Sequence, residues 1–354
     1  MTAPGTIARH RVAPSELDCT LPGIQHIGVR IEAADGEIEH LPVSILNRED
    51  GPSLLITAGI HGDEFEGPAA LLDLVRRLEA LPIRGRLILV PTANPAALAA
   101  SARRSPVDGR DLNRSFRAGA SSISEAIADF LVAHLLPAAE AVLDLHAAGR
   151  ALIMPSVMLD PRPTDRQGFR RSLGMARAFG ADAVLVIEQE ETGAMLDGAV
   201  MASGKAFVCA EIGSAAVLTP KSAALAEAGV ARVLDHLGLT AGQSDRAMSP
   251  RALLAIGEDL TVRTTASGFL RPLVEIGAKV RAGDALARLI DLAGAAPDAF
   301  IRAARTGVVY NIAGGGPVEA GAFVATIAEE LPPLPNDDAI WAASFERHLP
   351  PYQE

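Results

Sequence analysis

The sequence predicts an α/β protein in which a mixed sheet is flanked by helices and a small all-β sandwich follows. Two observations carry this prediction. From residue 42, short apolar runs bounded by turn-forming residues alternate with longer segments that have apolar residues at helical spacing. After about residue 245, the chain becomes rich in glycine, valine and short strand-like runs. Strand–helix alternation is typical of a sheet whose functional side chains lie at strand ends and in the loops that follow.

The first predicted domain spans residues 1–245, and its elements alternate in type. We expect strands at 41–46, 52–59, 85–94, 138–149, 182–188 and 205–214. We expect helices at 66–81, 124–136, 165–179 and 220–237, with Ser124 as the cap of the second. The polar stretch 100–119 has no periodicity, and a loop of that length in a compact domain is usually functional. Strands within residues 1–40 are expected to pack on the C-terminal β domain.

The second predicted domain spans residues 250–332 and contains an internal repeat. Residues 266–290 match residues 305–327 through a shared Val-x-Ala-Gly, at Val280–Gly283 and at Val318–Gly321. Two such halves predict a small β-sandwich that resembles a biotinyl/lipoyl-type domain. Residues 291–304, between the halves, contain no lysine that could carry a cofactor. We therefore expect a structural domain that flanks a site or an interface, followed by a tail at 333–354.

Composition narrows the partners and the compartment. The net charge is −11 and no Lys/Arg-rich run occurs, which argues against nucleic acid and acidic membranes as partners. The two cysteines, Cys19 and Cys209, lie outside any CxxC motif, so neither a disulfide framework nor a cysteine-based zinc site is expected. No apolar signal region and no spanning apolar stretch occur, which indicates a cytoplasmic protein. We expect it to form a homo-oligomer.

Residues of catalytic type follow three of the predicted strands. His61 and Glu64 form an H-x-x-E pair after the strand at 52–59, His146 ends the strand at 138–149, and Glu211 ends the strand at 205–214. Imidazole nitrogen and carboxylate oxygen suit zinc, and three protein ligands plus water compose a catalytic zinc site. We expect His61, Glu64 and His146 to hold one Zn²⁺ per chain.

The remaining polar residues are given roles by their chemistry. Glu211 would act as general base toward water, because a carboxylate beside the metal can take a proton and pass it to a leaving amine. Arg103, in the polar loop, would stabilise the developing oxyanion. Asn113 and Arg114 would bind a substrate carboxylate, Arg114 in bidentate fashion.

Three neighbouring residues are expected to have supporting roles. Asp63 would orient a ligating imidazole, because carboxylates often do so. Glu66 would lie in the first turn of the next helix, where a negative charge suits the helix dipole. Cys209 is expected to be a small core residue rather than a nucleophile.

These motifs resemble a known family. The segments GIHGDEFEG, ANP, DGRDLNRSF, DLHAAG and AEIG occur in the order of the succinylglutamate desuccinylase/aspartoacylase family, a branch of the zinc carboxypeptidase-like fold. The resemblance implies zinc ligation by His61, Glu64 and His146, catalysis by Glu211, and carboxylate binding by Asn113 with Arg114. It implies a carbonyl-polarising arginine at Arg103, although the adjacent Arg104 is an alternative. Within the family, ARRSPVDGRDLNR and GPAALLDLVRRL look most like N-acetyl-diaminobutyrate deacetylases of ectoine breakdown.

Several alternatives remain open at this point. A metallocarboxypeptidase acting on peptides is one, although the lid tyrosine typical of zinc carboxypeptidases is missing: Tyr310 and Tyr352 both lie outside the region ahead of Glu211. A non-catalytic metal-binding or assembly module is another, although such a module needs no base. The acidic stretch 187–198 is either a recognition surface for a cationic side chain or a solvated loop. The leading prediction is a zinc amidohydrolase that splits an N-acyl amino acid.

Overall fold

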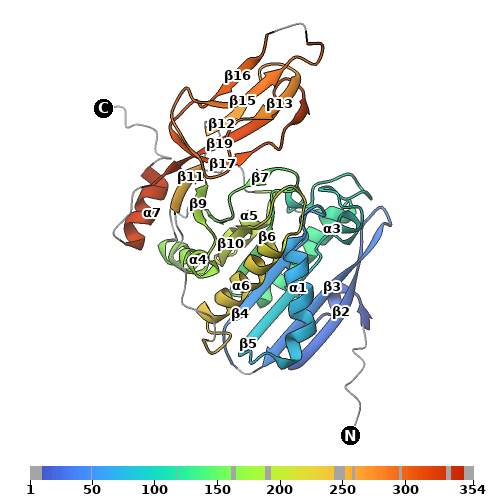
Figure 1. The fold of residues 1–354 in the computed structure, drawn as a ribbon. Helices are drawn as coiled ribbons and strands as arrows, with labels where there is room; N and C mark the ends of the chain where they lie inside the picture. The colour runs from blue at the N-terminus through green and yellow to red at the C-terminus, as the bar shows by residue number, and fades with distance from the viewer. Residues whose placement is uncertain are drawn as a thin grey trace, which may run out of the picture.

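A computed structural model describes residues 10–48, 50–117, 119–160, 165–187, 193–242, 252–256, 260–294, 297–331 and 336–346. A large twisted sheet with helices on its two faces forms the first part of the chain, and a β domain stands against one end of it (Figure 1). The predicted fold class is confirmed. None of the helices in these ranges is long and apolar enough to cross a membrane.

The main sheet is mixed, and its central strands are parallel. Its order is β1-β2-β3-β5-β4-β6-β10-β8-β9-β11. The strands are β1 (His10–Val12), β2 (Gly23–Glu32), β3 (Ile38–Arg48), β4 (Ser53–Ala58), β5 (Gly85–Val90), β6 (Ala141–His146), β8 (Ser156–Leu159), β9 (Ala183–Ile187), β10 (Ala206–Glu211) and β11 (Ala252–Ile256). Strands β5, β4, β6 and β10 all run in the same direction. Their carboxyl ends therefore meet at one edge.

Successive residues of a strand point to opposite faces of the sheet, so each buried strand contributes side chains to two apolar cores. In β4, Leu54 and Ile56 enter one apolar core, whereas Leu55 enters the other. The first core is covered by α1 (Glu66–Arg77), α4 (Arg166–Phe179) and α6 (Pro220–His236). The second is covered by α3 (Ile123–Phe130) and α5 (Leu196–Ala202), while α2 (Pro95–Ala99) follows β5.

The helix ends follow the chemistry of their sequences. Thr219 and Ser222 form a capping box at the start of α6, with Pro220 as its first residue. The predicted helix at 124–136 differs: its cap is Ser122, and after Phe130 the chain continues as a π turn and a 3₁₀ turn. Pro137 lies in that last turn, and a proline without an N–H cannot continue regular α-helical bonding.

The expectation that the N-terminal strands pack on the C-terminal domain is wrong. Strands β2 and β3 form a long antiparallel hairpin, and β3 pairs with β5 in the main sheet. Strand β1 pairs with β2. These strands thus lie at the edge of the main sheet opposite to the β domain (Figure 1).

The repeat folds into two facing sheets that exchange a strand. The first half supplies β13 (Gly268–Pro272), β14 (Lys279–Val280) and β15 (Ala285–Ile290), and the second supplies β17 (Gly307–Ile312), β18 (Gly316–Val318) and β19 (Phe323–Glu330). Strand β14 pairs with β17, and β18 pairs with β13, so each half gives its middle strand to the other. The equivalent glycines Gly283 and Gly321 both have φ near the left-handed region, at 92° and 84°, which explains the shared Ala-Gly turn.

Two joints attach the sandwich to the main sheet. Strand β11 pairs with β9 on one side and with β19 on the other. The short strand β7 (Leu152–Ile153), which follows β6, pairs with β17. Strand β12 (Thr261–Arg263) pairs with β19, and β16 (Ala299–Arg302) pairs with β15. The β11–β19 and β7–β17 pairings therefore hold the sandwich against the loops that follow β6.

Within the predicted tail, Asp337–Glu346 form helix α7, which packs on α4. Arg166 and Arg170 of α4 form ion pairs with Asp338. The Arg166 guanidinium also lies 5.5 Å from the ring centre of Trp341. This part of the C-terminal segment is thus tied back to the first domain.

Candidate functional site

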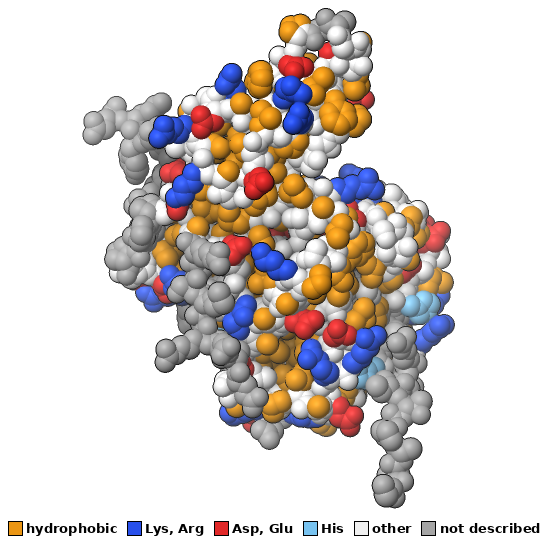
Figure 2. Space-filling model, viewed as in Figure 1, with side chains coloured by type: hydrophobic (Ala, Val, Ile, Leu, Met, Phe, Trp, Pro, Cys, Tyr) orange, Lys and Arg blue, Asp and Glu red, His pale blue; other side chains and the backbone are white. Residues whose placement is uncertain are grey.

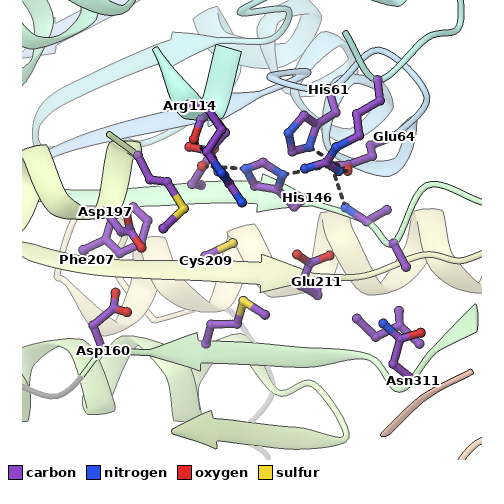
Figure 3. A pocket seen from close by; sticks show the side chains of 18 of the residues that line it. His61, Glu64, Arg114, His146, Asp160, Asp197, Phe207, Cys209, Glu211 and Asn311 are labelled. Atoms are coloured by element: carbon purple, nitrogen blue, oxygen red, sulfur yellow. Dashed lines mark hydrogen bonds and ion pairs between the residues drawn. The ribbon is translucent and has the colours of Figure 1, made fainter. Parts of the chain in front are cut away.

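Three parallel strands bring the sequence-predicted site residues to one edge of the sheet. Glu211, the last residue of β10, lies directly opposite His146, the last residue of β6. On the other side of β6, β4 ends at Ala58, and His61 follows within three residues. The predicted group His61, Glu64, His146 and Glu211 is therefore assembled around one point (Figure 3).

The sharp turn after β4 depends on two glycines. Gly59 has φ of 67°, and a Cβ there would lie 3.2 Å from the backbone of Thr92. A Cβ on Gly62 would lie 2.0 Å from the backbone carbonyl of Ala97. Only glycine fits at both positions, so the GIHG sequence allows the chain to reverse and present His61 and Glu64 before α1 begins. Helix α1 starts at Glu66, as predicted.

His61, Glu64 and His146 form a compact buried group. His61 Nδ1 lies 2.8 Å from Glu64 Oε1, and His146 Nδ1 lies 2.9 Å from Glu64 Oε2. Candidate ligand atoms of the three residues all lie within 4.8 Å of one another. Each residue is only 3% exposed. This is a two-nitrogen, one-oxygen donor set of the kind that zinc takes in catalytic sites.

Both histidines are also held by an aspartate on their far side. His61 Nε2 lies 3.1 Å from Asp111 Oδ1, and His146 Nε2 lies 2.7 Å from Asp144 Oδ2. Asp144 in turn accepts a hydrogen bond from the hydroxyl of Thr57 at 2.7 Å. An Nε2–H that donates to a carboxylate leaves the Nδ1 lone pair directed at Glu64. Because Nδ1 and a carboxylate oxygen are both acceptors, a proton or a metal ion is needed between them.

The predicted role of Asp63 as the partner of a ligating imidazole is wrong. Its Oδ1 has no hydrogen-bond partner among the described residues, and its Oδ2 would lie 2.9 Å from a Cβ at Gly149. Asp111, which holds His61, was missed because it lies fifty residues away in the aperiodic loop. The only signal in the sequence was that this loop is long, polar and inside a compact domain.

The electrostatics of the group favour a bound cation. Burial alone would raise the pKa of Glu64, but the charges and hydrogen bonds of His146 and His61 lower it to about 2. Burial would lower the pKa of His146, but the negative charges of Asp144 and Glu64 raise it well above its usual value. The surrounding carboxylates thus stabilise positive charge on the histidines, and they would stabilise a divalent cation in the same way.

Glu211 faces this group of residues. Its Oε2 is buried and has no hydrogen-bond partner among the described residues. Burial, followed by the negative charge of Glu64, raises the pKa of Glu211 to about 7 against the opposing effect of His146. A carboxyl group whose pKa lies near neutrality is suited to accept and release protons.

The polar loop brings the predicted arginines to the site in different ways. Arg103 lines the cavity; its Nε donates to Asp111 Oδ2 at 3.1 Å, and its Nη1 lies 3.7 Å from Glu64 Oε1. The neighbouring Arg104 instead donates to the carbonyl of Gly109. Of the two arginines, Arg103 thus lines the described cavity.

Asn113 and Arg114 both line the same cavity. The side-chain oxygen of Asn113 accepts from the backbone N–H of Leu196 at 3.2 Å, which leaves its NH₂ group as a donor. Arg114 donates through Nη1 to the carbonyl of Asn113. The two residues therefore present N–H donors of the kind that bind a carboxylate.

The cavity has a volume of about 340 Å³, and the C-terminal domain forms part of its wall. Tyr310, Asn311 and Thr326 from the sandwich line it together with Ile153 of β7. No sequence pattern connects Tyr310 with the site, yet this residue lines the cavity, and its hydroxyl lies 3.0 Å from the hydroxyl of Ser156. The joints β7–β17 and β11–β19 explain this position.

Two further findings concern residues that the sequence left ambiguous. Cys209 packs against the second apolar core, as predicted, but it also lines the cavity, and its sulfur lies within 4.8 Å of candidate ligand atoms of Asp144 and His146. Of the acidic stretch 187–198, residues 188–192 lie outside the described residues. Asp197, in the first turn of α5, lines the cavity and is 8% exposed. Asp160 lines the cavity as well.

The chain resembles known proteins over most of its length. The family described as "Succinylglutamate desuccinylase/Aspartoacylase catalytic domain" matches residues 50–237. The chain is 37% identical to the N-alpha-acetyl-L-2,4-diaminobutyric acid deacetylase of Halomonas elongata over 91% of this chain and 97% of that protein. The product-bound structure of the ectoine utilization protein EutE from Ruegeria pomeroyi superposes with a TM-score of 0.82, at 30% identity, over 89% of this chain and 98% of that one. An aspartoacylase family protein from Mesorhizobium loti gives a TM-score of 0.79 at 32% identity, over 90% and 98%. The chain therefore belongs to the succinylglutamate desuccinylase/aspartoacylase family.

Proposed function

We propose that this protein is a zinc-dependent amidohydrolase that removes the acyl group from an N-acyl amino acid, with Nα-acetyl-L-2,4-diaminobutyrate as the best substrate. It would act on a linear amide other than a peptide bond. The observation that carries the proposal is the convergence of His61, Glu64, His146 and Glu211 beside the donors of Asn113 and Arg114 in one small cavity. The 37% identity to a diaminobutyric acid deacetylase supports the choice of substrate.

The residues of the site fit zinc. His61 and His146 would bind it through Nδ1, and Glu64 through its carboxylate, while Asp111 and Asp144 hold the imidazole rings from behind. The acceptor atoms that face each other across this group support a cation between them. When bound, zinc would supply a Lewis acid that acidifies water and polarises a carbonyl group.

The other residues of the chain would perform the steps around it. Glu211 would take a proton from the attacking water and deliver it to the leaving amine nitrogen, a role that its pKa of about 7 supports. Arg103 would donate N–H groups to the oxygen that gains negative charge at the acyl carbon. The NH₂ of Asn113 and the guanidinium of Arg114 would bind the α-carboxylate and fix the amide in position.

The shape of the cavity favours a small substrate over a peptide. Ile153, Tyr310 and Asn311 form one wall of the cavity beside the β7–β17 pairing, and the cavity has a volume of about 340 Å³. An acyl amino acid fits such a volume, whereas a longer peptide would meet the C-terminal domain. We infer that residues 250–332 act here as a fixed wall of the site.

A substrate panel tests the proposal. Zinc-loaded protein is assayed with Nα-acetyl-2,4-diaminobutyrate, N-acetylaspartate, N-succinylglutamate and short peptides that carry a free C-terminal carboxylate. We expect hydrolysis of acyl amino acids, and fastest of the acetyl-diaminobutyrate, with little cleavage of peptides. Faster cleavage of peptides would favour a carboxypeptidase. Binding of zinc without cleavage of any compound would favour a non-catalytic metal-binding module.

A further inference from the structure

One end of the cavity is acidic. In Figure 3, Asp160 and Asp197 lie at one end and Asn311 at the other, with Cys209 and Glu211 between them. Both aspartates line the cavity, and each is only 8% exposed. They come from different elements, since Asp197 lies in α5 and Asp160 follows β8. This end has no part in the hydrolytic steps described above.

The Asp197 carboxylate is buried but only half satisfied. Its Oδ1 accepts from the backbone N–H of Gly198 at 2.7 Å, and Oδ2 has no hydrogen-bond partner among the described residues. Asp197 also forms no ion pair within 4.0 Å with any residue that the structure describes. Asp160 has an interaction of its own, so the argument rests on Asp197. A carboxylate that is nine-tenths buried and keeps one oxygen free toward a cavity is arranged to meet a ligand.

The positive charges near the Asp197 carboxylate do not fully compensate its negative charge. Burial, reinforced by the charge of Asp144, raises the pKa of Asp197 to about 6, although Arg114 and His146 oppose the rise. The nearby cations therefore compensate it only in part. A positive group inside the cavity would lower the cost of ionising Asp197.

The cavity also has apolar walls. Met158, Met195 and Phe207 line the cavity together with the two aspartates. Such walls suit a short run of methylene groups with a charged tip. In addition, Asn113 accepts from the N–H of Leu196, the residue before Asp197. The carboxylate-binding donors and the free acid are thus held next to each other.

We propose that Asp197, assisted by Asp160, forms the side-chain subsite that binds the ammonium group of a short diamino acid. The inference rests on the proposed function, since it assumes that Asn113 and Arg114 bind the α-carboxylate of the same molecule. The α-carboxylate of the amino acid would then bind Asn113 and Arg114, and the side-chain ammonium group of the same molecule would bind Asp197. The subsite would discriminate against neutral side chains of the same length and, more strongly, against anionic ones.

The test compares two substrates of equal length. Nα-Acetyl-2,4-diaminobutyrate carries an ammonium group where Nα-acetylhomoserine carries a neutral hydroxyl. In the Asp197→Asn variant, kcat/KM for the cationic substrate should fall about 10- to 100-fold, the range expected for loss of a charge-assisted hydrogen bond, whereas the neutral substrate should be nearly unaffected. Asp160→Asn should shift the preference in the same direction. The exposed Asp73→Asn, on α1, is a matched control that should leave both substrates unchanged.

Equal losses for both substrates in Asp197→Asn would overturn the proposal, because Asp197 would then only support α5. A binding measurement separates this failure from failure of the proposed function. Titration calorimetry with free 2,4-diaminobutyrate and free homoserine reports the subsite even if no acyl amino acid is cleaved. Tighter binding of diaminobutyrate by the wild type, lost in Asp197→Asn, would support the subsite; equal affinity for the two amino acids would refute it.

Discussion

The hydrogen bond behind His146 gives a sharp test of the metal site. Asp144 accepts from His146 Nε2 at 2.7 Å and from the Thr57 hydroxyl at 2.7 Å, so both of its oxygens are used inside a buried shell. Asp144→Asn keeps the shape and one carbonyl oxygen for His146, but it removes the negative charge that makes the imidazole a stronger ligand. Loss of such a partner typically weakens metal binding about 10- to 100-fold. This corresponds to about 1.4 to 2.7 kcal/mol of binding free energy.

The assay is a competition titration of zinc between the protein and a chelator of known affinity, with circular dichroism as a check of folding. Asp63→Asn is the matched control, because Asp63 is also buried beside the H-x-x-E pair but makes no hydrogen bond to either histidine that the structure describes. Its zinc affinity should stay near that of the wild type. An unchanged affinity in folded Asp144→Asn, or an equal loss in both variants, would refute the role assigned to Asp144.

Three further predictions follow from the contacts around the cavity. Arg103→Ala should lower kcat about 100- to 1000-fold with a smaller change in KM, while Arg104→Ala should stay near wild type in the same steady-state assay; equal losses would contradict the oxyanion role. Asp197→Asn should raise the free energy of unfolding at pH 8 by up to about 3 kcal/mol, because above pH 6 the folded chain carries an ionised buried carboxylate whose pKa was raised to about 6. The gain should fall as the pH drops below 6 and vanish below about pH 3, where Asp197 is protonated in both the folded and the unfolded chain because the unfolded pKa is near 3.8; a loss of stability at pH 8 in denaturant titrations would contradict this. Tyr310→Phe should cost about 1 to 3 kcal/mol in thermal unfolding, because the buried Ser156 hydroxyl loses its partner; no change would mean that the bond contributes nothing to stability.

Local patterns were sufficient to predict which residues lie at the functional edge of the sheet. His61, His146 and Glu211 follow apolar strands, and parallel strands place their carboxyl ends at one edge; the three meet at one point because β4, β6 and β10 are also neighbours in the sheet, which no local pattern specifies. The paired glycines around His61 likewise predict a sharp turn. These features depend on neighbours in sequence or on the general geometry of parallel sheets.

The missed features depend on long-range pairing. Asp111 reaches His61 from an aperiodic loop, and Tyr310 reaches the cavity through the β7–β17 and β11–β19 joints, which no local pattern specifies. The N-terminal hairpin was assigned to the wrong neighbour for the same reason, since alternation predicts a strand but not its partner.

The distribution of charged side chains on the surface is consistent with the acidic composition of the chain. On the face shown in Figure 2, Lys and Arg side chains are scattered among Asp and Glu side chains and form no continuous basic surface. Both cysteines are free, as predicted. The homo-oligomer and the cytoplasmic compartment stay predictions, and light scattering of the purified protein would test the first.

The central claim is that Glu211 serves as the base of a zinc-dependent deacylation. The most direct measurement is turnover of Nα-acetyl-2,4-diaminobutyrate by Glu211→Gln, with the zinc content of the same sample determined by elemental analysis. The glutamine keeps the size of the side chain but cannot accept the proton, so one zinc per chain should remain while kcat falls about 100- to 10,000-fold. Near-normal turnover at full zinc occupancy would contradict the account.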